Sequence, residues 1–319
     1  MDLILELFAQ GAQMTVVLVL APLLLGYTRK IKARFLRRRG PPLLQPYRDL
    51  LRLIRKEAVL AENASWLFRS GPYLIFSATW VAAALVPTFA TGLLFNWVGD
   101  LIVIAALLGS ARFFLALVGM DVGTSFGGIG SSREMMFATL AEPTMIMVAF
   151  TLALVAGSTQ LSYIAQFMLA NGSLRVSLGL VLAAFIIVSL AENARIPVDN
   201  PATHLELTMV HEAMVLEYSG RHLAVIELAS FLKLLLYVSL VGCVFVPWGL
   251  APVGVGFWPH AMGLIAYAGK LAFGATLLAV FETAIAKMRV FRVPAFLGAA
   301  FMMGILGVLL LFVSRGGLA

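Results

Sequence analysis

The sequence predicts an all-α fold, that of a polytopic membrane protein with about eight transmembrane helices and additional cytoplasmic amphipathic helices. Composition is the first reason, because 61% of the 319 residues are hydrophobic and only 12% are charged, whereas soluble domains carry about 25% charged residues. The second reason is the length of the apolar runs, since about 20 mostly apolar residues cross the hydrocarbon of a bilayer. The third is the uneven placement of basic residues between these runs. Lipid is therefore the expected solvent for most of the surface.

Eight runs are long and apolar enough to span a membrane. They cover approximately residues 3–27, 70–91, 97–119, 133–156, 175–193, 224–248, 259–283 and 294–314. Short turns or polar loops separate the runs and no internal repeat is evident, so residues 1–319 are treated as one transmembrane domain. Asp2 and Glu6 stand where a secretory signal would carry positive charge, which favours a retained first span.

The connections on one side of the predicted bundle hold nearly all of the basic residues. Between Arg29 and Arg69 the chain has twelve Lys or Arg residues and three acids, whereas the opposite side has only Arg175 and Arg315. Cytoplasmic loops of membrane proteins are enriched in Lys and Arg. We therefore expect the basic loop of residues 28–69 in the cytoplasm and both termini outside. The confinement of the basic excess to this loop argues against nucleic-acid binding.

The basic loop contains a predicted amphipathic helix that follows Pro46. Its apolar and basic positions fall on opposite sides at helical spacing, with Tyr47, Leu50, Leu51 and Ile54 facing away from Arg48, Arg52, Arg55 and Lys56. Such a helix lies in the membrane interface, with its apolar face in lipid or against protein. Two compatible interpretations stay open: an anchor in lipid, or a docking surface for a cytoplasmic subunit.

Several ionisable residues interrupt the predicted spans, where each costs at least about 2.5–3.5 kcal/mol to insert. They are Arg112, Glu134, Glu142, Glu192, Glu227, Lys233, Lys270 and Glu282. In one interpretation these residues pair with one another and fix the packing of the helices. In the other they form a proton path, because burial tunes a carboxyl group both to accept and to release a proton.

The connection over residues 194–222 is rich in acids and histidines. It holds Asp199, His204, Glu206, His211, Glu212 and Glu217. Asn200-Pro201 is a typical helix start, so a helix is predicted from there to about Tyr218, with both histidines on one face. This helix is interpreted either as a solvated amphipathic helix or as the polar wall of a cavity that feeds protons to the buried acids. Arg133 and Arg195 are expected to hold the carboxylates in register.

No metal or cofactor site is predicted in this chain. The segment HEAMV lacks the second histidine of an HExxH zinc site, and the glycine-rich residues 123–134 lack the GK[ST] of a phosphate-binding loop. Cys243 is the only cysteine, and a single thiol cannot hold an iron–sulfur cluster. Any redox centre that the protein serves is therefore expected in a partner.

Three segments together resemble subunit 1 of respiratory complex I and its hydrogenase relatives. They are RRGPPLLQPYRDLLRL (residues 38–53), GIGSSRE (residues 128–134) followed by Glu142-Pro143, and ENARIPVDNPATHLELTMVHEAMVLEYSG (residues 192–220). The likeness covers essentially the whole chain. Complex I has a glutamate-rich loop of the form PFDLPEAESE, where this chain reads PVDNPATHLE. That departure and the YRD triplet at residues 47–49 favour the membrane subunit of group 4 nickel–iron hydrogenases of the formate hydrogenlyase type.

The resemblance implies a non-catalytic subunit that anchors a cytoplasmic redox arm and links it to ion translocation. The implied location is the bacterial or archaeal cytoplasmic (inner) membrane. The implied partners are hydrogenase-like large and small cytoplasmic subunits, which would carry iron–sulfur clusters and a nickel–iron centre, and antiporter-like membrane subunits. The resemblance also implies that the loop of residues 37–57 meets the cytoplasmic subunits, through Arg38, Arg39, Gly40, Pro41, Gln45, Tyr47, Arg48 and Asp49.

The resemblance places five acids on a proton path: Glu142, Glu192, Asp199, Glu206 and Glu217. The chemistry of the residues themselves adds Glu134, His204 and His211, with Arg112, Arg133, Arg195 and Lys233 as charge partners.

Three other functions are compatible with the same spans. A quinone-binding subunit of a complex I-like dehydrogenase would use the acidic loop as a quinone chamber, and the altered acids count against it. A stand-alone ion transporter would use Lys233, Lys270 and the glutamates, but the chain shows no paired inverted halves. In a passive anchor, the charges would serve packing alone.

Overall fold

A computed structural model describes residues 2–92, 94–171, 176–199, 209–251 and 257–316. Within these ranges the regular structure is helical apart from two isolated β-bridges, which confirms the all-α prediction. The helices are α1 (Asp2–Phe35), α2 (Gln45–Ile54), α3 (Trp66–Leu85), α4 (Leu101–Asp121), α5 (Ser125–Ala156), α6 (Leu161–Ala170), α7 (Val176–Glu192), α8 (His211–Val215), α9 (Gly220–Val244), α10 (Phe257–Ala284) and α11 (Val293–Gly316), with short 3₁₀ helices η1 (Leu94–Trp97) and η2 (Val290–Arg292).

Six helices of the described part are long and apolar enough to cross a membrane: α1, α4, α5, α9, α10 and α11. Each corresponds to one predicted span. The other two predicted spans, residues 70–91 and 175–193, hold α3 and the 17-residue α7. The short helix α6 lies in a connection where no helix was predicted, and α1 continues to Phe35, well into the expected basic loop. The chain is a multi-pass membrane protein.

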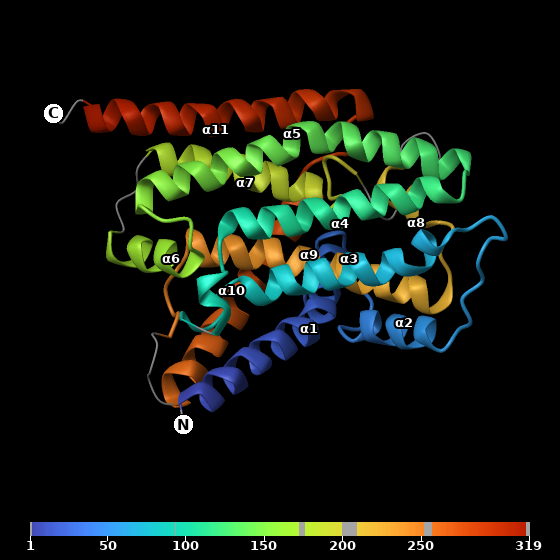
Figure 1. Ribbon diagram of the computed structural model, residues 1–319, viewed down its shortest axis with the longest axis horizontal. Helices are drawn as coiled ribbons and strands as arrows, with labels where there is room; N and C mark the ends of the chain where they lie inside the picture. Colours follow the sequence, from blue (N-terminus) through green and yellow to red (C-terminus); the bar gives the residue numbers. More distant parts are fainter. Residues whose placement is uncertain (1, 93, 172–175, 200–208, 252–256, 317–319) are drawn as a thin grey trace.

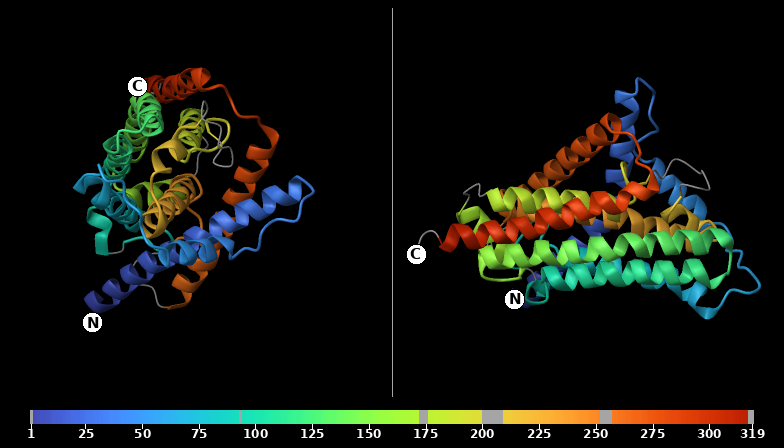
Figure 2. Two further views of the ribbon diagram at one scale, coloured as in Figure 1. Left: turned by 90° about the vertical axis from the view of Figure 1, so that its right-hand side faces the viewer. Right: turned by 90° about the horizontal axis from the view of Figure 1, so that it is seen from above.

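Both chain termini lie at one end of the bundle, which we call the terminal end. Helices α2 and α8 lie at the opposite end, here called the loop end (Figure 1). This arrangement agrees with an even number of membrane crossings. Figure 2 shows α4, α5 and α7 nearly end-on in the view in which α1 and α10 are seen lengthways, so these two helices cross the others obliquely.

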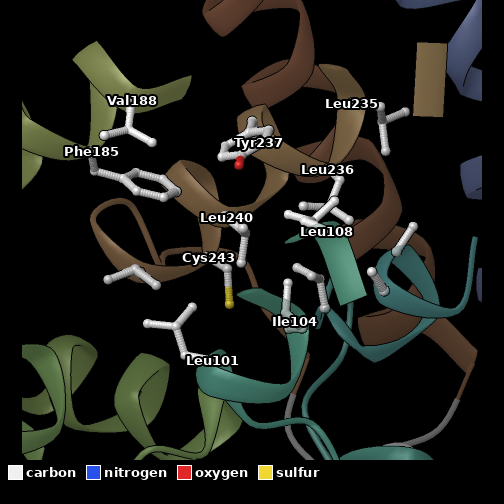
Figure 3. Close-up of a cluster of buried hydrophobic side chains, with 14 of the residues drawn as sticks. Leu101, Ile104, Leu108, Phe185, Val188, Leu235, Leu236, Tyr237, Leu240 and Cys243 are labelled. Atoms are coloured by element: carbon white, nitrogen blue, oxygen red, sulfur yellow. The ribbon is translucent and has the colours of Figure 1, made fainter. Parts of the chain in front are cut away.

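The interior between α4, α7 and α9 is apolar and tightly filled (Figure 3). Ile104 of α4 and Leu236 and Leu240 of α9 are fully buried, and Phe185 of α7 packs beside them. Buried aliphatic side chains of this kind make many dispersion contacts and leave no room for water. Within this core, Leu240 lies between Tyr237 and Cys243 (Figure 3).

Helix α2 forms where the amphipathic pattern predicted it. Pro46 and Leu50 are buried, whereas Leu51 and Ile54 are exposed and free to meet lipid or a partner. The Tyr47 hydroxyl donates a hydrogen bond to the Val19 carbonyl of α1. Burial raises the pKa of this hydroxyl. The helix is therefore fixed to the bundle on one side only.

Of the helix predicted from Asn200 to about Tyr218, the described part confirms only His211–Val215. Met209 and Val210 leave helical geometry, and residues 216 and 217 form a turn. The Asn200-Pro201 start lies outside the described residues. Tertiary contacts outweigh the local pattern here, since Arg133 Nη1 of α5 donates to the Met209 carbonyl at 2.8 Å.

The motif EYSG fastens the turn after α8 to the first loop. Tyr218 stacks on Phe68, with ring centroids 4.0 Å apart, and its hydroxyl donates to the Phe68 carbonyl. The Ser219 hydroxyl bonds both the amide and the carbonyl of Val59. Gly220 has φ +53°, and a Cβ there would lie 2.3 Å from the Glu57 carbonyl oxygen. Glycine is required at this position, and the two loops form one continuous surface.

Candidate functional site

Arg112 of α4 is the centre of a buried ionic cluster between the helices. It is 5% exposed. Its Nε lies 3.4 Å from Glu134 Oε1 and its Nη1 lies 3.7 Å from Glu142 Oε1, both on α5. Its Nη2 contacts the Glu192 carboxylate at the end of α7. One guanidinium thus draws together the three acids that the sequence placed in two different spans.

Lys233 of α9 completes this cluster, because its Nζ lies 2.9 Å from Glu192 Oε2. The Arg112 cluster therefore contains two cations and three carboxylates, Glu134, Glu142 and Glu192. With every group ionised the net charge is −1, so one bound proton makes the cluster neutral. Near-neutrality of this kind limits the uncompensated charge that the low-dielectric interior must hold.

Several polar atoms of the Arg112 cluster make ion pairs without hydrogen bonds of good geometry. These are Arg112 Nε, Arg112 Nη1 and Glu192 Oε2. Buried donors and acceptors without a hydrogen bond cost about 1–3 kcal/mol each, and water in adjoining polar cavities commonly satisfies them. The cluster is accordingly a place where water would take part in the hydrogen bonding.

Three cavities run from the loop end to the Arg112 cluster and beyond it. The entrance cavity, of about 130 Å³, is lined by Arg29, Asp199, His211, Glu212 and Glu227 among others. The central cavity, of about 40 Å³, shares His211, Asn193 and Ser230 with it and reaches Arg112, Glu134, Glu192 and Lys233. The lateral cavity, of about 400 Å³, shares Arg112 and Glu192 with the central one.

The lateral cavity opens on the side of the bundle between α4 and α5. It is lined by Glu142 and Tyr237 together with apolar side chains such as Phe113 and Ile146. The Glu142 side chain is 51% exposed, although it lies far inside a predicted span. A half-exposed carboxylate at this depth is costly in lipid. This face therefore suits a neighbouring membrane subunit better than hydrocarbon.

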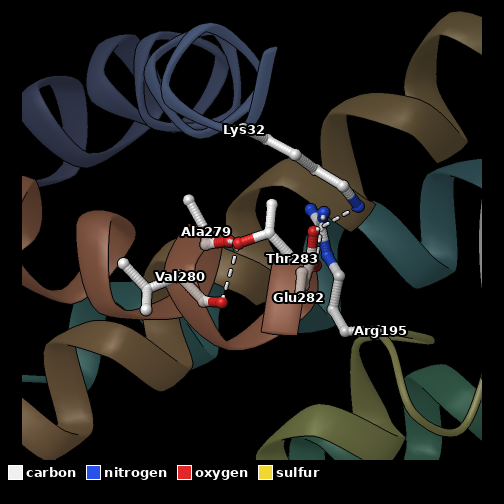
Figure 4. A network of polar contacts seen from close by, with 6 residues as sticks. All are labelled: Lys32, Arg195, Ala279, Val280, Glu282 and Thr283. Carbon is white, nitrogen blue, oxygen red and sulfur yellow. Dashed lines mark hydrogen bonds and ion pairs between the residues drawn. The ribbon is translucent and has the colours of Figure 1, made fainter. Parts of the chain in front are cut away.

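A second ionic group fastens the loop after α7 to α1 and α10. Glu282 of α10 is 5% exposed and lies 2.9 Å from Lys32 Nζ and 3.4 Å from Arg195 Nη1 (Figure 4). Burial lowers the pKa of the Arg195 guanidinium, and the nearby Glu282 opposes this shift. Lys287 Nζ lies 2.8 Å from the buried Asp199. This ion pair holds the Asp199 carboxylate, which lines the entrance cavity, in place.

The remaining predicted residues take several positions. His211 lines both the entrance and the central cavity. Arg133 binds the Met209 carbonyl and, within the described residues, no carboxylate. Glu217 is exposed on a turn and lines none of the three cavities. His204 and Glu206 lie outside the described residues.

The predicted docking residues surround α2 at the loop end. Arg38, Arg39, Pro41 and Arg48 are exposed, and Gly40, Gln45, Tyr47 and Asp49 are partly buried. Asp49 accepts hydrogen bonds from Gln45 and Arg52, which orders the exposed side of the helix.

Several residues of the site were not predicted as site residues from the sequence. Lys32 and Lys287 lie outside the charges named within the predicted spans, yet each pairs with a buried acid. Tyr237 and Asn193 line the cavities but are uncharged, so no intramembrane charge marked them. Glu282 and Glu227 were recognised as intramembrane acids without a role. Partners 88 residues apart in sequence, as in the Lys287 pair, leave no local signal.

Within the described residues, no group of three or more His, Cys, Asp or Glu side chains is placed to hold a metal ion. Cys243 is buried as a free thiol.

The fold and site define a multi-pass membrane protein with a buried ionic cluster between its helices. The chain belongs to the NADH dehydrogenase family, whose model matches residues 9–313. It is 34% identical over 291 residues to formate hydrogenlyase subunit 4 of Escherichia coli (strain K12), covering 91% of this chain and 93% of that one. It is 36% identical over 240 residues to hydrogenase-4 component C of the same organism, covering 75% of each.

More distant relatives include an NADH-quinone oxidoreductase subunit of Anaplasma phagocytophilum (strain HZ), which is 25% identical over 289 residues, covering 83% of each chain. Among solved structures, a chain of the membrane-bound sulfane sulfur reductase, an archaeal respiratory membrane complex, has the same fold. Its TM-score is 0.82 at 18% identity, covering 95% of this chain and 98% of that one. These relatives confirm the resemblance and support membership in a group 4 hydrogenase-like membrane complex.

Proposed function

We propose that this chain anchors the catalytic arm of a group 4 hydrogenase-type oxidoreductase in the cytoplasmic membrane and carries protons between that arm and the neighbouring membrane subunits. The observation that carries the proposal is the Arg112 cluster, which joins the central cavity to the lateral one. Two relatives of this chain are named formate hydrogenlyase subunit 4 and hydrogenase-4 component C. Nickel–iron and iron–sulfur centres would be held by the cytoplasmic partners.

The first step of the proposed relay is proton entry from the loop end. The entrance cavity offers Asp199, Glu212 and Glu227 as acceptors, and His211 spans the passage to the central cavity. An imidazole suits this position because it takes a proton on one ring nitrogen and releases another from the other.

The second step is transfer through the Arg112 cluster. Glu192 contacts Arg112 and Lys233 and lines both the central and the lateral cavity, so a proton bound there is exchangeable with either side. Glu142 is the last carboxylate along this line and faces the open side of the bundle. We assign the neighbouring antiporter-like subunit to this face and the hydrogenase-like subunits to α2 and the basic loop.

The test uses the assembled complex in proteoliposomes, with Glu142→Gln and Glu192→Gln as the variants. Each removes a protonatable group while keeping the shape of the side chain. Electron transfer should remain near the parent rate, and proton movement per electron should fall at least tenfold. Glu62→Gln, which changes an exposed acid outside the cavities, is the matched control. Unchanged proton movement in both variants would remove the Arg112 cluster from the path.

A quinone-binding role for the entrance cavity beside the acidic loop meets a difficulty of size. The entrance cavity formed by the described residues, at about 130 Å³, is smaller than the roughly 300–1,000 Å³ of common small-molecule sites. Inhibition of the intact complex by quinone-site ligands, with loss of that inhibition in His211→Ala, would nonetheless establish such a role and contradict the assignment to a hydrogenase-type arm.

A further inference from the structure

Helix α10 holds an intramembrane ionisable residue, Lys270, which the relay above does not use. Its ammonium donates to the Gly242 carbonyl at 3.3 Å. Among the described residues it makes no ion pair with a carboxylate, in contrast to Lys32, Lys233 and Lys287. An ammonium carries three donors, and an intramembrane charge without a carboxylate partner is costly unless water reaches it.

Polar groups from three different segments surround Lys270. The hydroxyls of Ser239 on α9 and Tyr267 on α10 are 2.8 Å apart. Thr88, in the segment after α3, is 3% exposed and its hydroxyl has no hydrogen-bond partner. With Cys243 these residues line a cavity of about 10 Å³, here called the Lys270 cavity. That volume holds about one water molecule, which needs two to four polar partners.

A second small polar cavity adjoins the first across Pro87, which lines both. The side-chain amides of Gln10 and Gln13 donate to the Ala84 carbonyl, and Gln13 also donates to that of Val86. The amide oxygen of each side chain therefore points away from these carbonyls. Those oxygens and Asn96 Oδ1 are buried without a hydrogen-bond partner. Gln10 and Gln13 belong to the N-terminal half of α1, which begins at the terminal end (Figure 1).

The backbone between the two cavities is not helical. Residues 86–91 run outside regular helix, and Ala90 pairs with Ala251 in an isolated bridge. Irregular backbone within a membrane protein is tolerated where it is buried in protein or lines a water-filled cavity. The two polar cavities on either side of Pro87 fit the second case.

On the other side, apolar side chains separate Lys270 from the Arg112 cluster. Figure 3 shows Leu240 between Tyr237, which lines the lateral cavity, and Cys243, which lines the Lys270 cavity. Leu240 and the adjacent Leu236 are fully buried. Water that reaches Lys270 from the terminal end thus meets a dry barrier before the relay.

We propose that Lys270 is a second proton-binding site, hydrated from the terminal end of the bundle and insulated from the Arg112 cluster. The neutral amine takes a proton from hydronium in the cavity, becoming an ammonium and leaving water, and the reverse step returns the proton to the same side. Thr88, Ser239 and Tyr267 hold the water that exchanges. The inference needs the membrane setting but does not rest on the relay through Glu142 and Glu192.

The only cysteine of the chain reports directly on this cavity. In oriented membrane vesicles containing the intact complex, Ag⁺ is added to one side at a time. Cys243 that Ag⁺ has not bound is then alkylated after denaturation and quantified by mass spectrometry of this chain. Ag⁺ from the terminal side should protect Cys243 at least tenfold faster than Ag⁺ from the loop side. Equal rates from both sides, or no protection from the terminal side, would overturn the proposal.

Two variants test the hydration and the proton. Thr88→Val removes a water partner and should slow protection severalfold, whereas Thr151→Val, a buried threonine away from both cavities, should not. As pH rises, Lys270 loses its positive charge and repels Ag⁺ less. The rate of protection should therefore rise by more than deprotonation of the Cys243 thiol alone would cause. Cys243 and Tyr267 are the other titratable groups that line the cavity. Lys270→Gln should abolish this additional pH step, and its persistence would show that Lys270 does not titrate.

The same measurement separates this inference from the proposed function. Glu142→Gln and Glu192→Gln should leave the protection of Cys243 unchanged, because Leu236 and Leu240 lie between. A loss of proton movement with normal Cys243 protection supports both proposals. Normal proton movement with one-sided protection supports the Lys270 site alone.

Discussion

Removing the negative charge of Glu282 should strongly destabilise the chain. Glu282→Gln keeps the volume of the side chain but leaves Lys32 and Arg195, now 2.9 Å and 3.4 Å from a neutral amide, without a counter-charge. Breaking a buried pair by removing one partner costs about 3–5 kcal/mol. The Lys32 side chain is 29% exposed, so solvent offsets part of its loss and the lower value is expected.

The assay is thermal unfolding of the purified complex in mild detergent, followed through this chain. A loss of about 3 kcal/mol corresponds to a lower midpoint on the order of 10 °C, from the 2–4 °C per kcal/mol typical of mid-sized domains. Adding Lys32→Met to Glu282→Gln should restore part of the loss, because one uncompensated cation disappears. The control is Arg52→Ala, which breaks a pair whose Arg side chain is 67% exposed and should cost about 0–1 kcal/mol.

Two results would refute this reasoning. The first is a Glu282→Gln complex as stable as the parent, since the three groups would then contribute no net pairing energy. The second is a double variant less stable than the single one, since Lys32 would then act through packing of its alkyl chain and not through its charge.

Further predictions concern the contacts that join the two loops. Gly220→Ala should destabilise the complex by more than about 1 kcal/mol, because the new Cβ would meet the Glu57 carbonyl at a φ of +53°; Gly128→Ala, with no atom within 4 Å of the new Cβ, should be neutral or stabilising in the same thermal assay. Tyr218→Phe keeps the stack on Phe68 but loses one hydrogen bond, so a cost of about 1 kcal/mol is expected. Tyr218→Leu removes both the stack and the hydrogen bond, so a larger loss for Tyr218→Phe than for Tyr218→Leu would contradict this reasoning.

The sequence was sufficient for the fold class and for marking the intramembrane ionisable residues from which the ionic cluster is built. Apolar runs of bilayer length and the cost of inserting charge are local properties, so Arg112, Glu134, Glu142 and Glu192 were all recognised before their contacts were known. Helix α2 was equally predictable from the sequence, because apolar and basic residues alternate at helical spacing within its ten residues.

The loop between α7 and α9 shows where local pattern fails. Residues up to Tyr218 have the composition of one amphipathic helix, yet the described part is helical only over His211–Val215. The competing interactions come from Arg133 and Val59, which bind the backbone and the Ser219 side chain of this loop from distant parts of the chain. No periodicity in the loop itself encodes those partners.

The sequence by itself determined that this is an all-α membrane protein with costly charges inside its spans, because hydrophobicity and the free-energy cost of burying charge act residue by residue. Only the tertiary structure decided which charges meet. Arg112 gathers carboxylates from α5 and α7, whereas Arg195 turns to Glu282 on α10. Electrostatic pairing depends on distances of a few ångströms between helices, and those distances are fixed by packing among residues far apart in the chain.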